Sequence, residues 1–294
     1  MTTMLPRHLQ GYATAEQPRS GGVLEMTFEP APSGRTVLCH LHRQVPLVVQ
    51  QELYFDSEWR ELPCVYILSS GGPNLGGDRF RQRIELRRGA VAHISTGAAT
   101  KVAEMPRDYS SVDTLLTLDE GAYLEWLPEP TILCRHARLH TTTRMVVTPS
   151  ATLFYSEIFM AGRKHRGELW EFDLLSTHTT VTRPDGTPLC SERMVVQPAA
   201  ERVRAVGVMR RWDVWACVTI LTPKECADAI YNELNSSMES DVALGVTHLP
   251  RGAGLAVRIV GAESSPVKRA VREVCGCVRR RVKGRAMPEE FPWR

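Results

Sequence analysis

A glycine-rich stretch, GGPNLGGD at positions 71–78, places a single carboxylate, Asp78, between two segments that look like strands. Such turns bind phosphate groups in many nucleotide-binding proteins. Here no Gly-Lys-Ser/Thr follows Gly76 and Gly77, so the lysine and the hydroxyl of a phosphate site are missing. From Arg81 onward the residues alternate with period two, which predicts a strand instead of a helix whose N-terminus could receive an anion. The stretch is therefore predicted to be a tight turn with Asp78 at its exit.

Two other pairs of residues have spacings that invite a metal interpretation. His40 and His42 are two positions apart in a predicted strand, so both face the same side and could chelate a metal ion. Two polar residues on the solvent side of a half-buried strand are the alternative. Cys275 and Cys277 lie on a predicted helix, where two positions span about 200° of rotation. One metal ion cannot bridge them, which favours packing, and no C-x-x-C pair occurs among the eight cysteines, which are expected to be reduced thiols.

Charge and hydropathy limit the class of protein. The formal charge of +3 comes from 36 basic and 33 acidic residues, a balance too even to indicate nucleic-acid binding. The basic run RRRVKGR at 279–285 is expected to be the solvated face and end of a helix. No stretch approaches the ~18 apolar residues of a membrane span, and the N-terminus lacks the apolar core of a secretory signal. We expect a cytoplasmic protein that binds neither nucleic acid nor membrane.

The elements that must position these residues are mainly strands. Short strand-like segments follow one another from Val23 to about Val218. Three joints look alike, around Gly89, Gly121 and Ser150, and each places a charged or Pro-containing corner and a small pair between two strands. Their interval of about 30 residues is in the range of stacked β architectures. Three similar hairpin turns are the alternative.

The pattern changes past Trp215. Thr222–Glu225 has the sequence of a capping box, followed by an apolar helical face. A second helix is predicted from Ser265, with its apolar stripe formed by the valines at 267, 271, 274, 278 and 282. Two strands joined by a glycine turn separate the helices. The sequence therefore predicts a small C-terminal β-α-β-β-α element.

The chain is expected to divide into three parts. Residues 1–20 carry proline and glycine without periodicity and are predicted to form a flexible tail. Residues 21–215 form the β body, and residues 216–294 form the C-terminal element packed on it. With 43% apolar residues the chain can bury a core, and we expect these parts to form one domain.

Seven segments, in their order and at their intervals, resemble the family of urease accessory protein UreD, called UreH in some bacteria. They are GRTVL, PLVVQQELY, GGPNLGGD, TGAATK, LEWLPEPTI, GELWEFDLLS and PLCSERM, and the resemblance runs from about Gly22 to FPW at 291–293. It implies a mainly β fold, with a stacked β-helix-like body of short strands and a small helical part, and no catalytic activity. It also implies assembly with the urease apoprotein, UreF and the GTPase UreG. Nickel in transit, with no tightly bound cofactor, would pass through a water-filled tunnel.

Carboxylates are the candidate ligands for a metal in transit. Nickel accepts oxygen and imidazole ligands, and isolated carboxylates facing water bind it weakly enough for release. The candidates are Asp78, Glu157 in YSEIF and Glu192 in CSERM, with His40 and His42 as weaker ones. No catalytic residue is expected.

Structural roles are the alternative for each candidate. Asp78 could cap the glycine turn, and Glu192 could pair with Arg193 or Arg163. Two other functions also stay open. One is a scaffold that reshapes urease without touching metal. The other is a β-solenoid hydrolase, which needs carboxyl groups within about 5–10 Å in an aromatic groove, and aromatic residues make up only 7% of the chain.

Two positions depart from the family pattern. Gly97 stands where the resemblance implies glutamine or a residue of similar size, and Ala103-Glu104 stand where an aromatic-arginine pair is expected. If this segment contacts a partner, the contact is altered in this chain.

Overall fold

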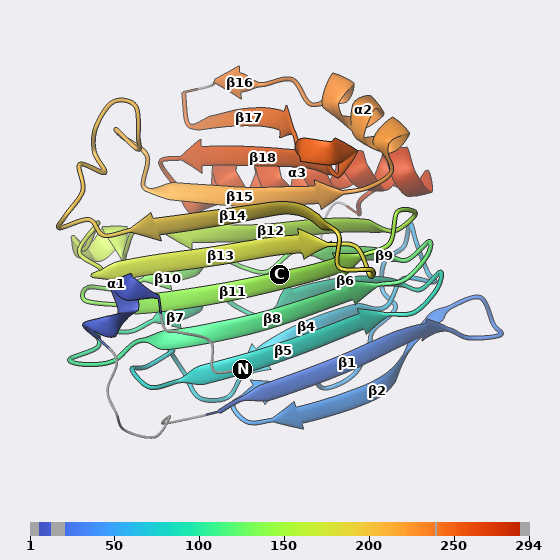
Figure 1. Cartoon of the computed structure of the whole chain (residues 1–294), viewed down its shortest axis with the longest axis horizontal. Coiled ribbons are helices and arrows are strands. Elements are labelled where there is room, and N and C mark those ends of the chain that lie inside the picture. The colour runs from blue at the N-terminus through green and yellow to red at the C-terminus, as the bar shows by residue number, and fades with distance from the viewer. Residues whose placement is uncertain (1–5, 13–20, 239, 289–294) are drawn as a thin grey trace.

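Two β-sheets face each other and form the body of the protein, and a helix covers the outer face of one of them (Figure 1). The computed structural model describes residues 6–12, 21–238 and 240–288. Residues 1–5 and 13–20 of the predicted tail and FPW at 291–293 lie outside the described residues, so the predictions for them are not addressed.

The front sheet in Figure 1 has seven strands. Its order is β14 (Pro188–Val196), β13 (Leu174–Thr182), β11 (Arg138–Val147), β8 (Ser110–Leu118), β5 (Arg79–Leu86), β1 (Val23–Pro30) and β2 (Thr36–Gln44). The five central strands run parallel, and the two edge strands β14 and β2 pair antiparallel.

The second sheet has eleven strands and lies behind the first (Figure 1). Its main path is β16 (Ser237–Met238), β17 (Val242–His248), β18 (Gly254–Gly261), β15 (Val214–Leu221), β12 (Thr152–Met160), β9 (Tyr123–Trp126), β6 (Val91–Thr96), β4 (Cys64–Ser69) and β3 (Leu47–Val48). Off this path, β10 (Thr131–Leu133) pairs with β12 and with β7 (Thr100–Val102). Strands β4, β6, β9 and β12 run parallel.

The three similar joints are stacked corners and not hairpins. Each connects a strand of one sheet to a strand of the other: β5 to β6, β8 to β9, and β11 to β12. Gly89 and Gly121 both have φ +70°, a left-handed conformation that favours glycine. The corners bond to one another, since Gly89 N donates to Glu120 O at 2.9 Å and Gly121 N donates to Ser150 Oγ at 3.1 Å. The predicted β-helix-like body is confirmed, with about 4 turns.

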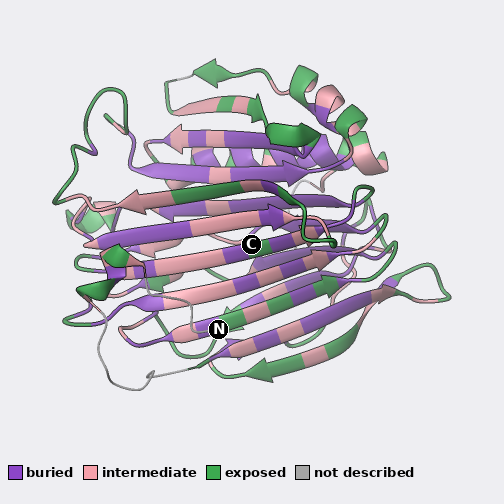
Figure 2. Cartoon of the chain, viewed as in Figure 1, coloured by how far each residue is buried: buried purple, intermediate pink, exposed green. Residues whose placement is uncertain are grey.

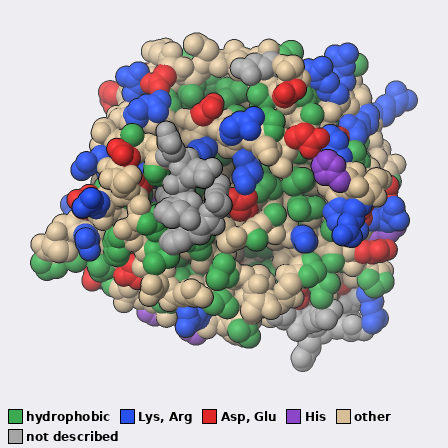
Figure 3. All heavy atoms as spheres, turned by 180° about the vertical axis from the view of Figure 1, so that it is seen from behind, with side chains coloured by type: hydrophobic (Ala, Val, Ile, Leu, Met, Phe, Trp, Pro, Cys, Tyr) green, Lys and Arg blue, Asp and Glu red, His purple; other side chains and the backbone are tan. Residues whose placement is uncertain are grey.

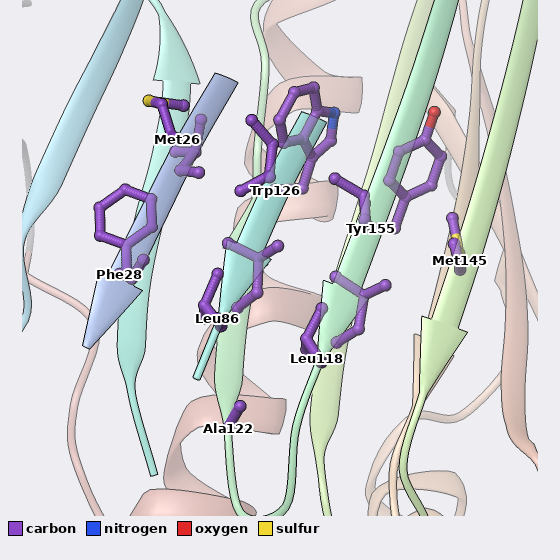
Figure 4. Close-up of a cluster of buried hydrophobic side chains, with 14 of the residues drawn as sticks. Met26, Phe28, Leu86, Leu118, Ala122, Trp126, Met145 and Tyr155 are labelled. Carbon is purple, nitrogen blue, oxygen red and sulfur yellow. The ribbon is translucent and has the colours of Figure 1, made fainter. Parts of the chain in front are cut away.

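Alternating side chains of both sheets fill the interior. The central strands are largely buried, whereas edge strand β2 is mostly exposed (Figure 2). Met26 and Phe28 on β1 lie in one cluster with Leu86 and Leu118, which come from the ends of β5 and β8 (Figure 4). Period-two alternation in the sequence thus corresponds to one face buried between the sheets.

The C-terminal element extends the second sheet. Strands β15, β18, β17 and β16 follow β12 antiparallel, and α2 (Lys224–Glu233) and α3 (Ser264–Lys283) pack on this extension. The valine stripe of α3 is buried as predicted, with Val282 only partly so. The prediction of a capping box is wrong, since α2 begins after Pro223 without a side-chain cap. The Thr222 hydroxyl instead forms a hydrogen bond with Thr152 Oγ1 at 2.9 Å. Two short 3-10 turns, η1 (Lys164–Arg166) and η2 (Pro250–Gly252), complete the described elements.

The described part of the predicted tail, residues 6–12, packs against the body. It contains the short helix α1 (Arg7–Gln10), which lies on the outer face of the front sheet (Figure 1). Leu9 is buried with Tyr109 and Leu174. The division of the chain into a tail, a body and a C-terminal element stays a prediction.

Candidate functional site

A cavity of about 470 Å³ lies between the two sheets. Gln82 on β5, Thr114 on β8 and Thr143 on β11 occupy one row of the front sheet and line it. From the second sheet, Trp126 and Tyr155 stack with ring centroids 6.3 Å apart (Figure 4). Gln82 Oε1 is buried and has no hydrogen-bond partner within the described residues. The cavity is therefore lined by a mixture of apolar, aromatic and polar side chains, and the polar row can bind water.

Glu157 is the acidic side chain deep in this cavity. It follows Tyr155 by two positions on β12, so both side chains point inward. Burial raises the pKa of Glu157 to about 7, the hydrogen bond from Tyr155 opposes this rise, and the charge of Glu192 adds to it. The Tyr155 hydroxyl also contacts Thr143 Oγ1 at 3.0 Å. At neutral pH the carboxyl group therefore exchanges readily between its protonated and its charged form.

One rim of the cavity is formed by the loops around β7 and β10. Lys101 and Glu129 lie there, and Glu129 pairs with Lys268 of α3 at 2.6 Å. Gly97 also lines the cavity, and a Cβ at this position would lie 2.2 Å from Leu68 Cδ2. Leu68 thus fills the space that a side chain at position 97 would take. A larger residue at position 97 would therefore require the end of the Leu68 side chain to move.

Asp78 holds the glycine turn together. Its Oδ2 accepts a hydrogen bond from Leu75 N at 2.8 Å, and Asp78 N donates to Leu75 O at 3.1 Å. Gly77 has φ +91°, and a Cβ on Gly76 would lie 2.5 Å from Arg107 O. The glycines are required by a left-handed backbone and by a close approach of two chain segments. Asp78 is not among the residues that line the cavity.

Glu192 lies at a second cavity of about 440 Å³, beside the edge strand β14. Its partner is Arg258 on β18, and not Arg193 or Arg163. Arg163 instead pairs with Glu168. Sequence reasoning missed Arg258 because this residue is 66 positions away in the chain and lies in the other sheet, so only the packing of the two sheets brings it to β14.

The histidine and cysteine pairs lie elsewhere. His40 and His42 are exposed on edge strand β2, opposite Thr27 and Glu25 of β1. Within the described residues no group of three or more His, Cys, Asp or Glu side chains could hold a metal ion. Cys275 and Cys277 are buried residues of α3, and burial raises the pKa of Cys277 to about 12. Their predicted packing role agrees with this burial.

A buried ionic cluster was missed by sequence reasoning. Arg279 on α3 is fully buried, so the expectation of a solvated basic run is wrong at this residue. Its Nε and Nη2 donate to the two carboxylate oxygens of Glu125 at 2.7 Å each, and Nη1 donates to Asp56. His93 Nδ1 and the Tyr123 hydroxyl each contact Glu125 at 2.8 Å. The sequence signal for this cluster was Glu125, a charged residue within the apolar strand YLEWL.

Comparison with known proteins addresses the family directly. The family model described as UreD urease accessory protein matches residues 20–294. A protein from Brucella ovis named urease accessory protein UreD 2 is 39% identical over 274 residues, covering 92% of this chain and 90% of that protein. The urease accessory protein UreD of Yersinia pseudotuberculosis serotype O:1b is 37% identical over 287 residues, covering 95% and 89%. The chain belongs to the UreD urease accessory protein family.

Four of the seven motifs that carry the UreD resemblance contribute to the lining of the first cavity, with Leu47 coming from PLVVQQELY. GGPNLGGD contributes Gly72, Pro73 and Asn74 to its lining, TGAATK contributes positions 97–101, and LEWLPEPTI contributes Trp126 and Glu129. Membership of this family supports a role in urease maturation. No helix in the described ranges is long and apolar enough to cross a membrane.

Charges of both signs mix on the surface. On the face seen from behind, Lys and Arg side chains are interspersed with Asp and Glu (Figure 3).

Proposed function

We propose that this chain conducts nickel to the urease apoprotein through the cavity between its two sheets. It would act as a cytoplasmic scaffold in a complex with UreF and, through UreF, with the GTPase UreG. The observation that carries this proposal is the position of Glu157, a carboxyl group with a pKa of about 7 on the wall of a 470 Å³ cavity. Nickel is the cargo in this proposal and not a resident cofactor.

The composition of the cavity suits transit better than storage. A conduit must bind an ion strongly enough to admit it and weakly enough to release it. One carboxylate that protons compete for, surrounded by hydroxyl and amide groups, meets both conditions at neutral pH. The described lining contains no set of ligands that would retain nickel. The contact of Asp78, Glu192, His40 and His42 with nickel stays a prediction.

The contacts of the carboxylates disfavour a hydrolase. Asp78 is hydrogen-bonded inside its turn and Glu192 is paired with Arg258, so of these three candidates only Glu157 lines the interior cavity. Such groups do not face each other across a groove as a general acid and a general base would. We therefore propose a protein without enzymatic activity. A scaffold that reshapes urease without touching metal is the competing function.

Replacement of Glu157 by glutamine tests the conduit. With the cognate urease operon, we expect E157Q to lower nickel per urease active site by about three- to tenfold, because the cavity loses its charge, with unchanged yield of the complex. The measurement is metal analysis of purified urease alongside pull-down of the complex. E225Q, an exposed change on α2, is the matched control and should load nickel normally.

The scaffold function predicts a different result. Under it, E157Q urease would carry full nickel, or lose nickel only as complex yield falls. Asp78→Ala in the same assay is expected to cost about 1 kcal/mol of stability through loss of the turn cap.

A further inference from the structure

Three residues of the second sheet form a row that leads from the first cavity to the second. Glu157 on β12 pairs with Cys217 on β15, and Cys217 pairs with Arg258 on β18. Paired residues of antiparallel strands project from the same face, with Cβ atoms about 4.5–5.5 Å apart. Glu157 lines the first cavity, whereas Cys217 and Arg258 line the second.

The row links the lining of the first cavity to that of the second beside the last strand of the front sheet, and we call it the junction. Strand β14 is the last strand of that sheet, while the second sheet continues past it through β15 and β18 (Figure 1). The row therefore emerges beside β14, where Glu192 lies. The Glu192 and Arg258 charges both act on Glu157, one raising and the other lowering its pKa, which places them within electrostatic reach of the first cavity.

Arg258 is held in place at this junction. Its Nη2 donates to Glu192, and its Nη1 donates to Val257 O at 3.0 Å and to Val218 O at 3.3 Å. The guanidinium is thus a tethered cation on the side of Cys217 away from Glu157. Any other cation that crosses the junction meets this positive charge first.

We propose that Arg258 is an electrostatic gate between the two cavities. This inference rests on the proposed nickel passage. A divalent cation would cross by displacing the guanidinium from Glu192. The carboxylates of Glu157 and Glu192 would then bind the ion on the two sides of Cys217. Removal of the guanidinium opens the junction to cations of any kind.

Cys217 supports this arrangement and also offers a probe. Burial raises the pKa of its thiol to about 12, so at neutral pH the thiol is uncharged and does not trap the passing ion. Cys217 lines the second cavity, and because thiol reagents attack the thiolate, labelling is followed at alkaline pH and only the ratio of the rates of two reagents is compared. The positive charge of Arg258 should attract an anionic reagent to this thiol and repel a cationic one.

The first test measures the gate without nickel. The full chain, as purified, is treated with a cationic and an anionic methanethiosulfonate, and mass spectrometry follows the peptide that contains Cys217. In the native chain the anionic reagent should react faster. In R258M the ratio of cationic to anionic rate should rise by at least about tenfold.

The controls keep this test decisive. Arg193 also lines the second cavity, but it lies on β14 outside the row, so R193M removes the same charge at another point of the cavity wall and should change the ratio less than R258M does. E192Q releases the guanidinium from its partner and should lower the ratio. Equal ratios of cationic to anionic labelling rate in R258M and R193M would overturn the gate. If R258M fails to fold, an unchanged ratio in E192Q would overturn it.

The second test measures nickel. In cells given limiting nickel, R258M should raise nickel per urease active site relative to native and R193M chains, and no difference would overturn the gate. If urease matured with E157Q carries normal nickel, the conduit is overturned instead. The ratio of cationic to anionic labelling of Cys217 would still test the role of Arg258. The two proposals can therefore fail separately.

Discussion

Arg279 is buried completely beneath α3, and its charge is compensated by two carboxylates, Glu125 and Asp56. The bidentate contact with Glu125 matches the planar guanidinium to the carboxylate. Arg279 and His93 together hold the pKa of Glu125 well below its usual range, although burial alone would raise it. The cluster connects α3 to β9 and β6 across the outer face of the second sheet.

Replacement of Arg279 by methionine should destabilise the protein by about 3–5 kcal/mol, because two carboxylates would remain buried without a cation. Thermal or denaturant unfolding measures this loss. Arg280 is the matched control, since it is exposed and pairs with Glu233 at 2.8 Å, and R280M should cost less than about 1 kcal/mol. Similar losses in the two variants would show that the cluster contributes no special stability.

At the scale of elements, α1 is fixed to the front sheet by few contacts. His8 Nε2 and His140 Nδ1 both contact Ser176 Oγ, at 2.7 and 3.1 Å. Arg138 lies over the Tyr12 ring, 4.5 Å from its centroid. Burial lowers the pKa of His140 to about 4, and the charge of His8 lowers it further. The pKa of His8 is also lowered, first by burial.

Acid should therefore release α1. Release of α1 removes the charge of His8 and part of the burial, so the pKa of His140 rises from about 4 toward its ordinary value of 6.5 and the docked state binds fewer protons. Docking is fully stable above pH 6.5 and loses about 1–2 kcal/mol, after allowance for solvent screening, as pH falls from 6.5 to 4. Hydrogen exchange of residues 7–10, corrected for the intrinsic pH effect, measures this. H140N should reduce the pH response, and equal protection at pH 7 and pH 4.5 would contradict the prediction.

At the scale of the whole molecule, the body and the C-terminal element share a sheet and a core. The predicted boundary after residue 215 falls within β15, which pairs with β12 along its whole length. Helix α3 contacts β12, β15 and β18, and its valines pack with Phe154 and Ile158 of β12. Without the C-terminal element, β12 would become an open edge and the outer face of the sheet would lose its apolar cover.

A chain that ends at residue 211 should therefore fail to fold and should aggregate, while the full chain unfolds in one transition. A chain that starts at residue 21 is the control, because it loses only α1 and the segments next to it, and it should keep a cooperative transition. Calorimetry and size-exclusion chromatography compare the three. A monomeric truncated chain with its own cooperative transition would show that the C-terminal element is a separate domain.

Local patterns predicted the elements well because they report local physics. Period-two alternation states which side chains face inward, the left-handed corners require Gly89 and Gly121, and the valine spacing follows from 3.6 residues per turn. The same patterns failed where a residue has two competing uses. Thr222 could cap α2, but in the fold its hydroxyl bonds Thr152 instead.

The sequence by itself determined the family, the mainly β fold and Glu157 as a candidate, since these depend on residues close together in the chain or on a matching order of motifs. Only the tertiary structure decided that Glu192 faces Arg258, that Arg279 is buried with Glu125, and that Glu157 lines a cavity while Asp78 caps a turn. The physical reason is range. The partner of a charge depends on which strand or helix is brought beside it, and here the paired residues are 66 and 154 positions apart.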